Sequence, residues 1–412
     1  MASGGKLQAP RGTFDVLPDE GRRRAALRRI CEELFEPAGY GPIETPVFEA
    51  TELFARGVGE TTDIVQKEMF TFEDQGGRSL TLRPEGTAGV CRAYLEHGMH
   101  KLPQPVKLWY WGPFFRHEAP QAGRYRQFNQ VGIEAIGSDD PSLDAESILL
   151  LGELLERVGA KGLRLRLGSL GTPDTRRAYS DELRDYLRGR ESELSGEVRD
   201  RLEANPLRAF DSDHPGTQAV MRDAPKLLER LNPDDAAHFA EVRALLDEAG
   251  RSYDVDDALV RGIDYYTRTV FEFTSDALGA QSGVGGGGRY DGLVEQLGGA
   301  HTPGVGFASG IERILMVSAG PETADKAPDV YVVRDGDGAA TDAFAVLRAL
   351  RDAGFSAQME QAGRSLKGQL KQADRVGARA VVIVGGVGVP VKDMSSGDQQ
   401  DAPDLPGAIE ML

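Results

Sequence analysis

A polar hairpin in the first third of the chain constrains its fold more than any other feature. Residues 114–118 and 128–134 predict two antiparallel strands, because both runs carry aromatic or branched side chains in an extended pattern. Pro120 and Gly123 between them are turn signals, so the strands are joined by a flexible loop. The chain therefore contains at least one antiparallel sheet.

The return strand of this hairpin presents polar groups where a core strand would present apolar ones. Gln130 and Glu134 lie an even number of residues apart, so both side chains project from one face of the sheet. Arg116, Arg124 and Arg126 lie nearby, and a guanidinium is suited to bind the oxygens of a phosphate or carboxylate. A solvated hairpin with scattered charge is the alternative interpretation.

Composition excludes several classes of protein. The 412 residues, 40% hydrophobic and 27% charged, predict a globular protein of two or three domains with no membrane partner. Cys31 and Cys91 form no metal-type pair, and His97 and His100 have no third ligand nearby, so no protein-bound metal site is expected. The N-terminus lacks the apolar core of a signal peptide, and we expect a reducing, cytoplasmic location.

The net charge of −17 argues against a protein that binds nucleic acid over its whole surface. It does not exclude a nucleic-acid partner, because screening over about 8 Å lets a local basic face act independently of the total charge.

The N-terminal region predicts a helix and then an unusual strand. Residues 20–38 carry apolar side chains at helical spacing, and residues 43–47 predict a strand. Pro46 places this strand at an edge or at an interface. The two elements could be plain scaffold or a dimer seam.

A strand-to-helix junction follows. Residues 70–72 and 79–83 predict two strands, and a helix is expected from Pro84 to about residue 96. Glu85 and Thr87 lie at this junction, where free backbone N–H groups and side chains often meet ligands. Capping of the helix by Thr87, with Glu85 favoured by the helix dipole, is the alternative.

The middle of the chain predicts a helix over residues 144–158, a strand over 163–167 and a charged helical insertion over about 172–232, in which no chemistry is evident. A strand pattern resumes over 259–273, where a dense polar and aromatic cluster suits a ligand pocket better than a core.

Two glycine-rich segments follow. Residues 283–292 predict a turn whose glycines let backbone approach a ligand, and neither the P-loop nor the dinucleotide fingerprint is present. Residues 303–314 predict a strand that leads into a helix carrying Arg313.

Residues 319–328 read as a linker, and residues 329–412 as a C-terminal α/β domain with a parallel sheet. Five basic residues there are spaced so that a helix would carry them as one stripe: Arg364, Lys367, Lys371, Arg375 and Arg379. A solvated face is the usual explanation of such a run, and phosphate contact is favoured here.

These segments resemble, in order, the class II aminoacyl-tRNA synthetases and, among them, the histidyl-tRNA synthetases. The class signatures are the helix with the Pro46 strand, the Phe-Arg-His-Glu hairpin and Gly310-Ile311-Glu312-Arg313. Residues 259–266 and 286–292 match segments of the histidine enzymes. The resemblance implies an α+β catalytic domain over residues 1–318, built on a mainly antiparallel sheet flanked by helices, and an anticodon-binding-like domain over 329–412.

The resemblance also implies an activity and its ligands. Such enzymes activate L-histidine with ATP to histidyl-adenylate and transfer it to the 3' end of tRNA(His), releasing AMP and pyrophosphate. ATP is a substrate, Mg²⁺ is expected with it, no tightly bound organic cofactor is implied, and a homodimer is expected.

Individual residues acquire roles from the same resemblance. The implied catalytic residues are Arg116, Arg261 and Arg313. The implied ATP-binding set is Arg116, Glu118, Arg124, Phe128, Arg261 and Arg313. The implied histidine-binding set is Glu85, Thr87, Gln130, Glu134, Tyr265 and Tyr266. The implied tRNA-binding set is Gln121, Arg364, Lys367, Lys371 and Arg375.

The chain departs from the family pattern in places. Ala119 stands where the family usually has an arginine, which concerns recognition of the tRNA acceptor end, and residues 385–391 are shorter than usual. The alternative function is a histidine-sensing regulatory subunit of ATP phosphoribosyltransferase. That paralogue should lack the triphosphate arginines and the C-terminal domain, whereas this chain has both. A third possibility, an RNA-binding module that uses no nucleotide, leaves the pocket carboxylates without a purpose.

Overall fold

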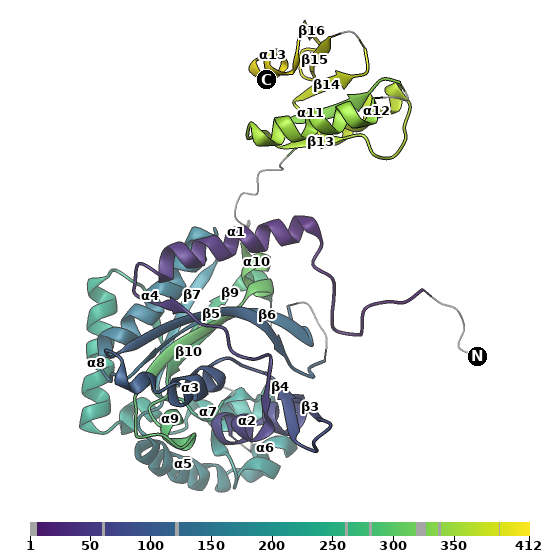
Figure 1. Ribbon diagram of the computed structural model, residues 1–412. Coiled ribbons are helices and arrows are strands. Elements are labelled where there is room, and N and C mark those ends of the chain that lie inside the picture. Colours follow the sequence, from purple (N-terminus) through teal and green to yellow (C-terminus); the bar gives the residue numbers. More distant parts are fainter. Residues whose placement is uncertain are drawn as a thin grey trace. The chain divides into compact units, whose positions relative to one another are not determined.

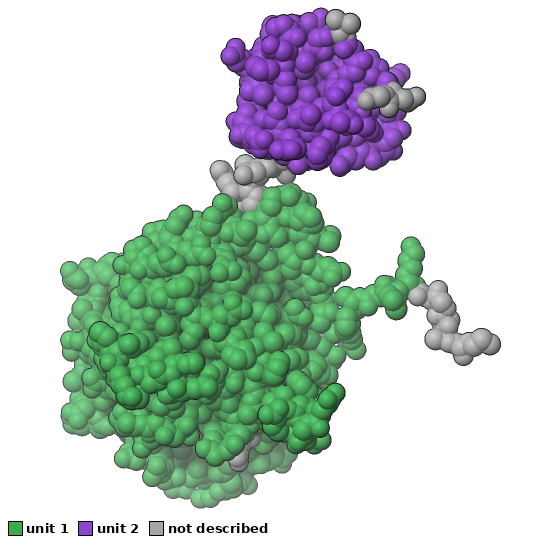
Figure 2. Space-filling view, in the orientation of Figure 1, with its two compact units in different colours: residues 1–322 green, residues 323–412 purple. Residues whose placement is uncertain are grey.

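The chain forms two compact units, Met1–Glu322 and Thr323–Leu412 (Figure 2). The expected linker lies mostly outside the residues that the computed structural model describes. None of the helices in the described part of the chain combines the length and the apolar character of a membrane span. The described residues are 6–59, 62–119, 123–259, 263–279, 282–318, 327–336, 339–386 and 388–412.

An eight-stranded sheet forms the centre of the larger unit (Figure 1). The five inner pairings are antiparallel and the two outermost are parallel, which confirms the prediction of a mainly antiparallel sheet. The strand order is β1 (Gly41–Pro42), β5 (Val106–Phe115), β6 (Gln127–Ile136), β11 (Gly304–Gly310), β10 (Gly283–Arg289), β9 (Thr267–Ser275), β7 (Leu163–Ser169), β8 (Asp254–Val255).

The two faces of this sheet differ in chemistry because side chains alternate along each strand. Paired residues on one face are Trp109, Ile133, Phe307, Gly287, Phe271 and Leu167. The adjacent row, on the other face, is Tyr110, Gly132, Ala308, Gly286, Glu272 and Arg166. The first face is apolar, and the second has charged groups at one end and small residues in its middle.

Helices cover the apolar face and bury it. Leu27 and Phe35 of one helix and Leu151 of another share a single core with Ile133 and Phe307 of the sheet. These helices are α1 (Pro18–Phe35), α4 (Pro141–Arg157), α8 (Pro233–Glu248) and α10 (Ile311–Val317). The predicted helices over 20–38 and 144–158 therefore exist within a few residues of their expected ends, and α4 begins where the side chain of Asp140 accepts the N–H of Ser142 at 2.8 Å.

A small three-stranded sheet lies on the other side, beside helices that cover the large sheet there (Figure 1). It comprises β2 (Phe48–Ala50), β4 (Ser79–Leu82) and β3 (Phe70–Glu73), with α2 (Thr51–Val58), the π-helical turn Ile64–Glu68, α3 (Thr87–Glu96), the 3-10 turn Met99–Lys101 and α9 (Leu293–Gln296) nearby.

The predicted strand over residues 43–47 is wrong. The N–H of Ile43 donates to the carbonyl of Trp109 at 2.8 Å, whereas the carbonyl of Val47 accepts from the N–H of Arg83 at 3.0 Å. The segment therefore crosses from the large sheet to the small one. Pro46 between these contacts has no N–H with which to continue a ladder.

Two other expectations about strands require correction. Residues 283–289 form the inner strand β10, not a turn, because glycines here admit very close neighbours: a Cβ on Gly287 would lie 1.9 Å from the carbonyl oxygen of Gly306. The strand expected over 259–273 begins only at Thr267; residues 263–266 form a turn, and 260–262 lie outside the described residues.

Helices occupy the predicted insertion, with an apolar cluster that includes Tyr179, Leu183, Leu202 and Val220. The elements are α5 (Pro173–Arg188), the 3-10 turn Glu191–Glu193, α6 (Gly196–Arg201), the 3-10 turn Pro206–Asp211, α7 (Pro215–Arg222) and the 3-10 turn Leu227–Arg230; a further 3-10 turn, Asp276–Leu278, follows β9.

The smaller unit contains a five-stranded sheet whose prediction as parallel holds for only three strands. The parallel strands are β13 (Ala357–Met359), β12 (Val330–Arg334) and β14 (Ala380–Val384). An antiparallel hairpin, β15 (Val389–Asp393) and β16 (Gln399–Ala402), extends the sheet. A tight turn allows this pairing, because the side chain of Asp393 accepts the N–H groups of Ser395 and Ser396. The helices are α11 (Ala340–Asp352), α12 (Leu366–Arg375) and α13 (Leu405–Glu410).

Candidate active site

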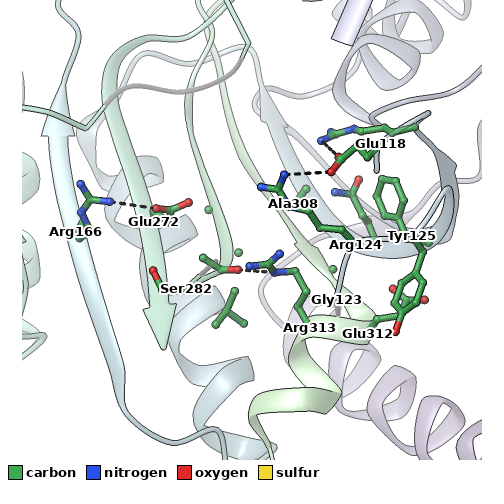
Figure 3. A pocket seen from close by; sticks show the side chains of 18 residues that line it. Glu118, Gly123, Arg124, Tyr125, Arg166, Glu272, Ser282, Ala308, Glu312 and Arg313 are labelled. Atoms are coloured by element: carbon green, nitrogen blue, oxygen red, sulfur yellow. Dashed lines mark hydrogen bonds and ion pairs between the residues drawn. The ribbon is translucent and has the colours of Figure 1, made fainter. Parts of the chain in front are cut away.

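A cavity of about 440 Å³ opens on the polar face of the large sheet (Figure 3). Its walls come from the loop that follows β5, from β6, β7, β9, β10 and β11, and from the start of α10. Six residues predicted as ligands line it: Arg116, Glu118, Arg124, Phe128, Gln130 and Arg313. Every predicted ATP-binding residue in the described part of the chain therefore reaches one cavity.

The arginines of the cavity are held in place by neighbouring oxygens. Nε of Arg116 donates to the carbonyl of Pro84 at 2.9 Å, and its guanidinium lies 5.5 Å from the ring centre of Phe128. Arg124 forms an ion pair with Glu118 at 3.2 Å. Three positively charged groups with fixed positions, counting Arg313, suit a polyanionic ligand.

Arg313 is held by the backbone of β10. Its Nε donates to the carbonyl of Gly283 at 2.6 Å, at the start of β10. Burial lowers the pKa of Arg313, and Arg124 lowers it further by repulsion. A guanidinium remains charged despite such a shift. Two cations that repel one another across a cavity both gain from an anion between them.

Arg166 and Glu272 also line the cavity, and they were not predicted from the sequence as site residues. Arg166 pairs with Glu272 at 3.4 Å, and its Nε donates to Asp256 at 2.6 Å (Figure 3). A signal was present, because Glu272 is a charged residue between Phe271 and Phe273 in an otherwise apolar strand.

Buried Glu312 fixes the strand that carries Phe128. Its two carboxylate oxygens accept the backbone N–H of Asn129 at 3.1 and 3.0 Å, and Oε1 also accepts from the Asn129 amide at 3.1 Å. Arg24 of α1 donates to the same oxygen at 3.0 Å. Glu312 thus connects the hairpin to α1 and lies next to Arg313.

The N-terminal leader contacts the hairpin loop. The N–H of Arg126 donates to the carbonyl of Gly12 at 2.8 Å, and the rings of Phe14 and Tyr125 lie 4.7 Å apart. The guanidinium of Arg24 lies 5.7 Å from the ring centre of Phe14. Tyr125 lines the cavity, so the leader supports one of its walls.

The remaining predicted histidine ligands form a buried cluster. Glu134, on the same strand and face as Gln130, is 1% exposed. The hydroxyl of Thr87 donates to its Oε1 at 2.7 Å, and the hydroxyl of Tyr290 donates to its Oε2 at 2.6 Å. Burial raises the pKa of Glu134 to about 8. Tyr290 belongs to the segment 286–292 that resembles the histidine enzymes, but it was not predicted as a site residue.

Glu85, not Thr87, caps helix α3. Its carboxylate accepts the backbone N–H of Thr87 at 2.7 Å and that of Ala88 at 3.0 Å, whereas the Thr87 hydroxyl turns to Glu134. The alternative of capping by Thr87 is therefore wrong. Burial raises the pKa of Glu85, which the two backbone hydrogen bonds oppose.

Tyr265 and Tyr266 complete this cluster. Both are buried, their ring centres lie 4.8 Å apart, and the Tyr265 hydroxyl donates to Glu85 at 3.4 Å. Among the described residues, Oε1 of Gln130 is buried without a hydrogen-bond partner. A buried acceptor without a partner suits a ligand that brings an N–H donor.

The remaining predicted residues are either outside the described part of the chain or in the smaller unit. Arg261 and Gln121 are outside the described residues. The predicted basic stripe is wrong in extent, because α12 carries only the middle three of its residues. Arg364 precedes the helix and pairs with buried Glu360 at 3.1 Å, and Arg379 follows its end. Lys367, Lys371 and Arg375 are exposed.

Carboxylates, histidines and cysteines do not gather in threes as a metal site anywhere in the described part of the chain. The charged groups of the cavity are instead arginines with carboxylate partners. An antiparallel sheet with arginines from a β5–β6 hairpin and from the β11–α10 junction over an open cavity defines a class II aminoacyl-tRNA synthetase.

Comparison with known proteins identifies the family within that class. A family model of histidyl-tRNA synthetases matches residues 12–314. A histidine–tRNA ligase of Desulforamulus reducens is 48% identical over 95% of this chain and 96% of its own. One of Desulforudis audaxviator is 50% identical over 92% of this chain and 91% of its own. The chain belongs to the histidyl-tRNA synthetase family.

A solved structure agrees with this result. The apo histidyl-tRNA synthetase of S. aureus is 37% identical, has a TM-score of 0.82, and covers 98% of this chain and 99% of its own.

Proposed function

We propose that the cavity binds ATP and the buried cluster binds histidine, so that histidyl-adenylate forms where the two meet. The chain is an ATP-dependent ligase of its family: it activates L-histidine with ATP and transfers the histidyl group to the 3' end of tRNA(His), releasing AMP and pyrophosphate. One observation carries the site assignment. Gln130 and Glu134 occupy one face of β6, with Gln130 in the cationic cavity and Glu134 in the buried cluster.

In the activation step, an oxygen of the histidine carboxylate forms a bond to the α-phosphorus, and the bond from that phosphorus to pyrophosphate breaks. Arg116 is suited to hold both the histidine carboxylate and the α-phosphate. Its side chain lines the cavity, and its Nε donates to the carbonyl of Pro84, the residue before Glu85. Arg313 would hold the γ-phosphate. Fixed cations stabilise the charge that develops in the transition state without reorganising.

Arg261 is proposed as a third cation, at the α-phosphate, on the family resemblance alone. Mg²⁺ would enter with ATP. Glu118 and Glu272 supply carboxylate oxygens to the cavity lining, the kind of ligand that Mg²⁺ prefers, so both fit a role in holding it, and bound Mg²⁺ would neutralise phosphate charge.

Glu85, Thr87 and Gln130 are proposed to bind the α-amino group of histidine, and Glu134, Tyr266 and Tyr265 the imidazole. Imidazole presents one N–H donor and one acceptor in its neutral form. A carboxyl group and a phenol can match both, and an amino acid without them would leave these buried groups unpaired. Such a site rejects side chains that cannot hydrogen-bond.

Lys367, Lys371 and Arg375 are proposed to contact tRNA phosphates, with Gln121 near the acceptor end. Arg364 is a weaker candidate, because it already pairs with Glu360. We place the reaction in the cytoplasm, where protein synthesis consumes charged tRNA.

A homodimer is also proposed. Val47, Phe48 and Phe72 are exposed, with Phe48 47% and Phe72 44% accessible and their rings 6.3 Å apart. A contiguous exposed apolar patch marks an interaction surface, and the contact between the two rings makes these side chains contiguous. Sedimentation of Phe48→Asp should yield monomers if these residues form the dimer contact, whereas an unchanged dimer would place the contact elsewhere.

The activation step is tested by histidine-dependent ATP–pyrophosphate exchange without tRNA. Arg116→Ala, Arg261→Ala and Arg313→Ala should each lower kcat/KM about a hundredfold or more. Arg157→Ala, which removes an exposed arginine paired within α4, is the control. Histidine binding without exchange in the native chain would overturn the assignment and favour the histidine-sensing paralogue.

A further inference from the structure

We propose that Arg176 of the helical insertion is a positioning residue for histidine recognition, because its guanidinium holds the backbone on both sides of Tyr265. This inference rests on the proposed histidine site. It assigns to the insertion a role that neither the sequence nor the family match provides.

The contacts of Arg176 are unusual for a surface helix. It lies in the first turn of α5, and its side chain is half-buried. Nη1 donates to the carbonyl of Asp264 at 3.2 Å and to that of Tyr266 at 3.1 Å, and Nη2 donates to Asp264 at 3.1 Å. One planar side chain thus binds the two carbonyls that flank Tyr265.

Residues 263–266 form a turn before β9, outside the sheet ladder. The carbonyls of Asp264 and Tyr266 are bound by Arg176, so a side chain from the insertion supplies hydrogen bonds that a strand would obtain from its neighbour. The orientation of the two phenol rings follows from this backbone. Tyr265 reaches Glu85, and Tyr265 also contacts the ring of Tyr290 at 5.8 Å.

A second contact fixes the same segment to the base of the insertion. Arg268 has a φ of 46°, a left-handed conformation that residues other than glycine rarely adopt. Its Nε donates to buried Asp235 at 3.0 Å, and its backbone pairs with Leu170 and Gly171.

Asp235 joins the beginning and the end of the insertion. Its Oδ2 accepts from the N–H of Thr172 at 2.8 Å, from the Thr175 hydroxyl at 3.0 Å and from the Asn232 amide at 2.9 Å. The chain therefore enters and leaves the insertion at one carboxylate, which also holds Arg268. Arg176 follows one residue after Thr175, so its position relative to the tyrosine pair is well defined.

Two features indicate that this geometry concerns recognition more than packing. The donors of Arg176 are placed on the backbone carbonyls of Asp264 and Tyr266, although burial there lowers the pKa of the guanidinium and so disfavours its charged form. The carbonyls belong to the segment that carries Tyr265 and Tyr266, whereas the ATP cavity has no lining residue from α5. Loss of Arg176 should therefore affect histidine and not ATP.

The experiment compares Arg176→Ala, Arg176→Lys and Arg177→Ala in ATP–pyrophosphate exchange. Arg177 is the matched control, an exposed neighbour whose partner is Asp174 at 3.7 Å. Arg176→Ala should raise the KM for histidine about tenfold or more, with the KM for ATP changed less than about twofold. Arg176→Lys should recover part of this loss, because an ammonium can bind one carbonyl but not both in a fork. Arg177→Ala should match the native chain.

Direct calorimetric titration of histidine, without ATP, and thermal unfolding complete the test. An equal rise in both KM values, or a histidine affinity unchanged in Arg176→Ala, would overturn the proposal. If Arg176→Ala unfolds, the test rests on Arg176→Lys. A histidine KM for Arg176→Lys equal to that of the native chain would overturn the proposal. Absence of exchange in the native chain would instead refute the proposed function, so the two failures are distinguishable.

Discussion

The hydroxyl of Tyr290 donates a 2.6 Å hydrogen bond to Oε2 of Glu134. Glu134 lies on β6 and Tyr290 directly after β10, two strands that are separated in the sheet by β11. Gly306 on that intervening strand leaves the required space, because a Cβ there would lie 2.2 Å from the same carboxylate oxygen. A buried carboxyl group is thus held by hydroxyl donors, and in the proposed histidine site its protonation would set how the imidazole binds.

The first prediction concerns pH. Burial raises the pKa of Glu134 to about 8 from an ordinary 4.5, so between these values the folded free protein holds a proton that the unfolded chain has released. The imidazole of histidine titrates near pH 6.5. Between pH of about 6.5 and 8 the carboxyl group of Glu134 is therefore protonated and the imidazole is neutral. The carboxyl proton can then be donated to the acceptor nitrogen of the ring. The kcat/KM for histidine should be highest in this window, fall below it as imidazole gains a second proton, and fall above it as Glu134 ionises.

Measurement of exchange from pH 5.5 to 9 tests this profile, with Glu134→Gln as comparison. An alkaline limb that persists in Glu134→Gln would belong to the amino group of the substrate and contradict the assignment. The same proton predicts a stability effect. The contribution of Glu134 to the free energy of unfolding is fully present below pH of about 4.5 and is lost as pH rises through about 8.

The second prediction concerns Gly306→Ala. The added methyl would meet Glu134 and the carbonyl of Ile133, each at 2.2 Å, so the carboxylate must move. The KM for histidine should rise about tenfold or more, because misplacement of a buried ligand is costly. Gly21→Ala, in the first turn of α1 where the nearest atom lies at 4.0 Å, should have no effect on the KM for histidine. Equal histidine KM values in both variants would contradict the proposed role of Glu134.

The third prediction concerns the N-terminal leader. Phe14→Ala removes a ring contact with Tyr125, worth about 1 kcal/mol, and loosens one wall of the ATP cavity. The KM for ATP should rise about fivefold, whereas the histidine affinity in calorimetric titration should not change. Leu7→Ala is the control, since Leu7 is fully exposed. A KM for ATP in Phe14→Ala equal to that of the native chain would show that the leader does not support the cavity.

The fourth prediction concerns tRNA. The triple substitution Lys367→Ala, Lys371→Ala and Arg375→Ala should raise the KM for tRNA in aminoacylation and leave ATP–pyrophosphate exchange intact. The slope of log affinity for tRNA against log salt concentration should become less negative by about 2, because binding releases fewer counterions when phosphate contacts are lost. Arg348→Ala, an exposed arginine of α11, is the control. An unchanged salt slope would show that α12 does not contact phosphate.

Local sequence pattern was sufficient for much of the fold. The hairpin of β5 and β6, the helices α1 and α4 and the Arg313 helix follow from periodicity, turn residues and short-range spacing. The bounds of the first hairpin strand were wrong, because it runs over Val106–Phe115 and not over residues 114–118. Errors occurred where neighbours distant in sequence decide the outcome. Residues 283–289 were predicted as a turn because glycine disfavours strands, yet they lie between β9 and β11, where the close approach of β11 leaves no room for a side chain at Gly285 and Gly287.

The sequence by itself determined which chemical groups this protein brings to its site: an amide and a carboxylate on one strand, arginines at two junctions, and two adjacent tyrosines. Only the tertiary structure decided how they are held. Arg24 meets Glu312 across 288 residues, and Arg176 meets Asp264 across 88. Spacing along a strand or helix fixes the side of the element on which a residue lies, but contacts between elements depend on the packing of the whole chain.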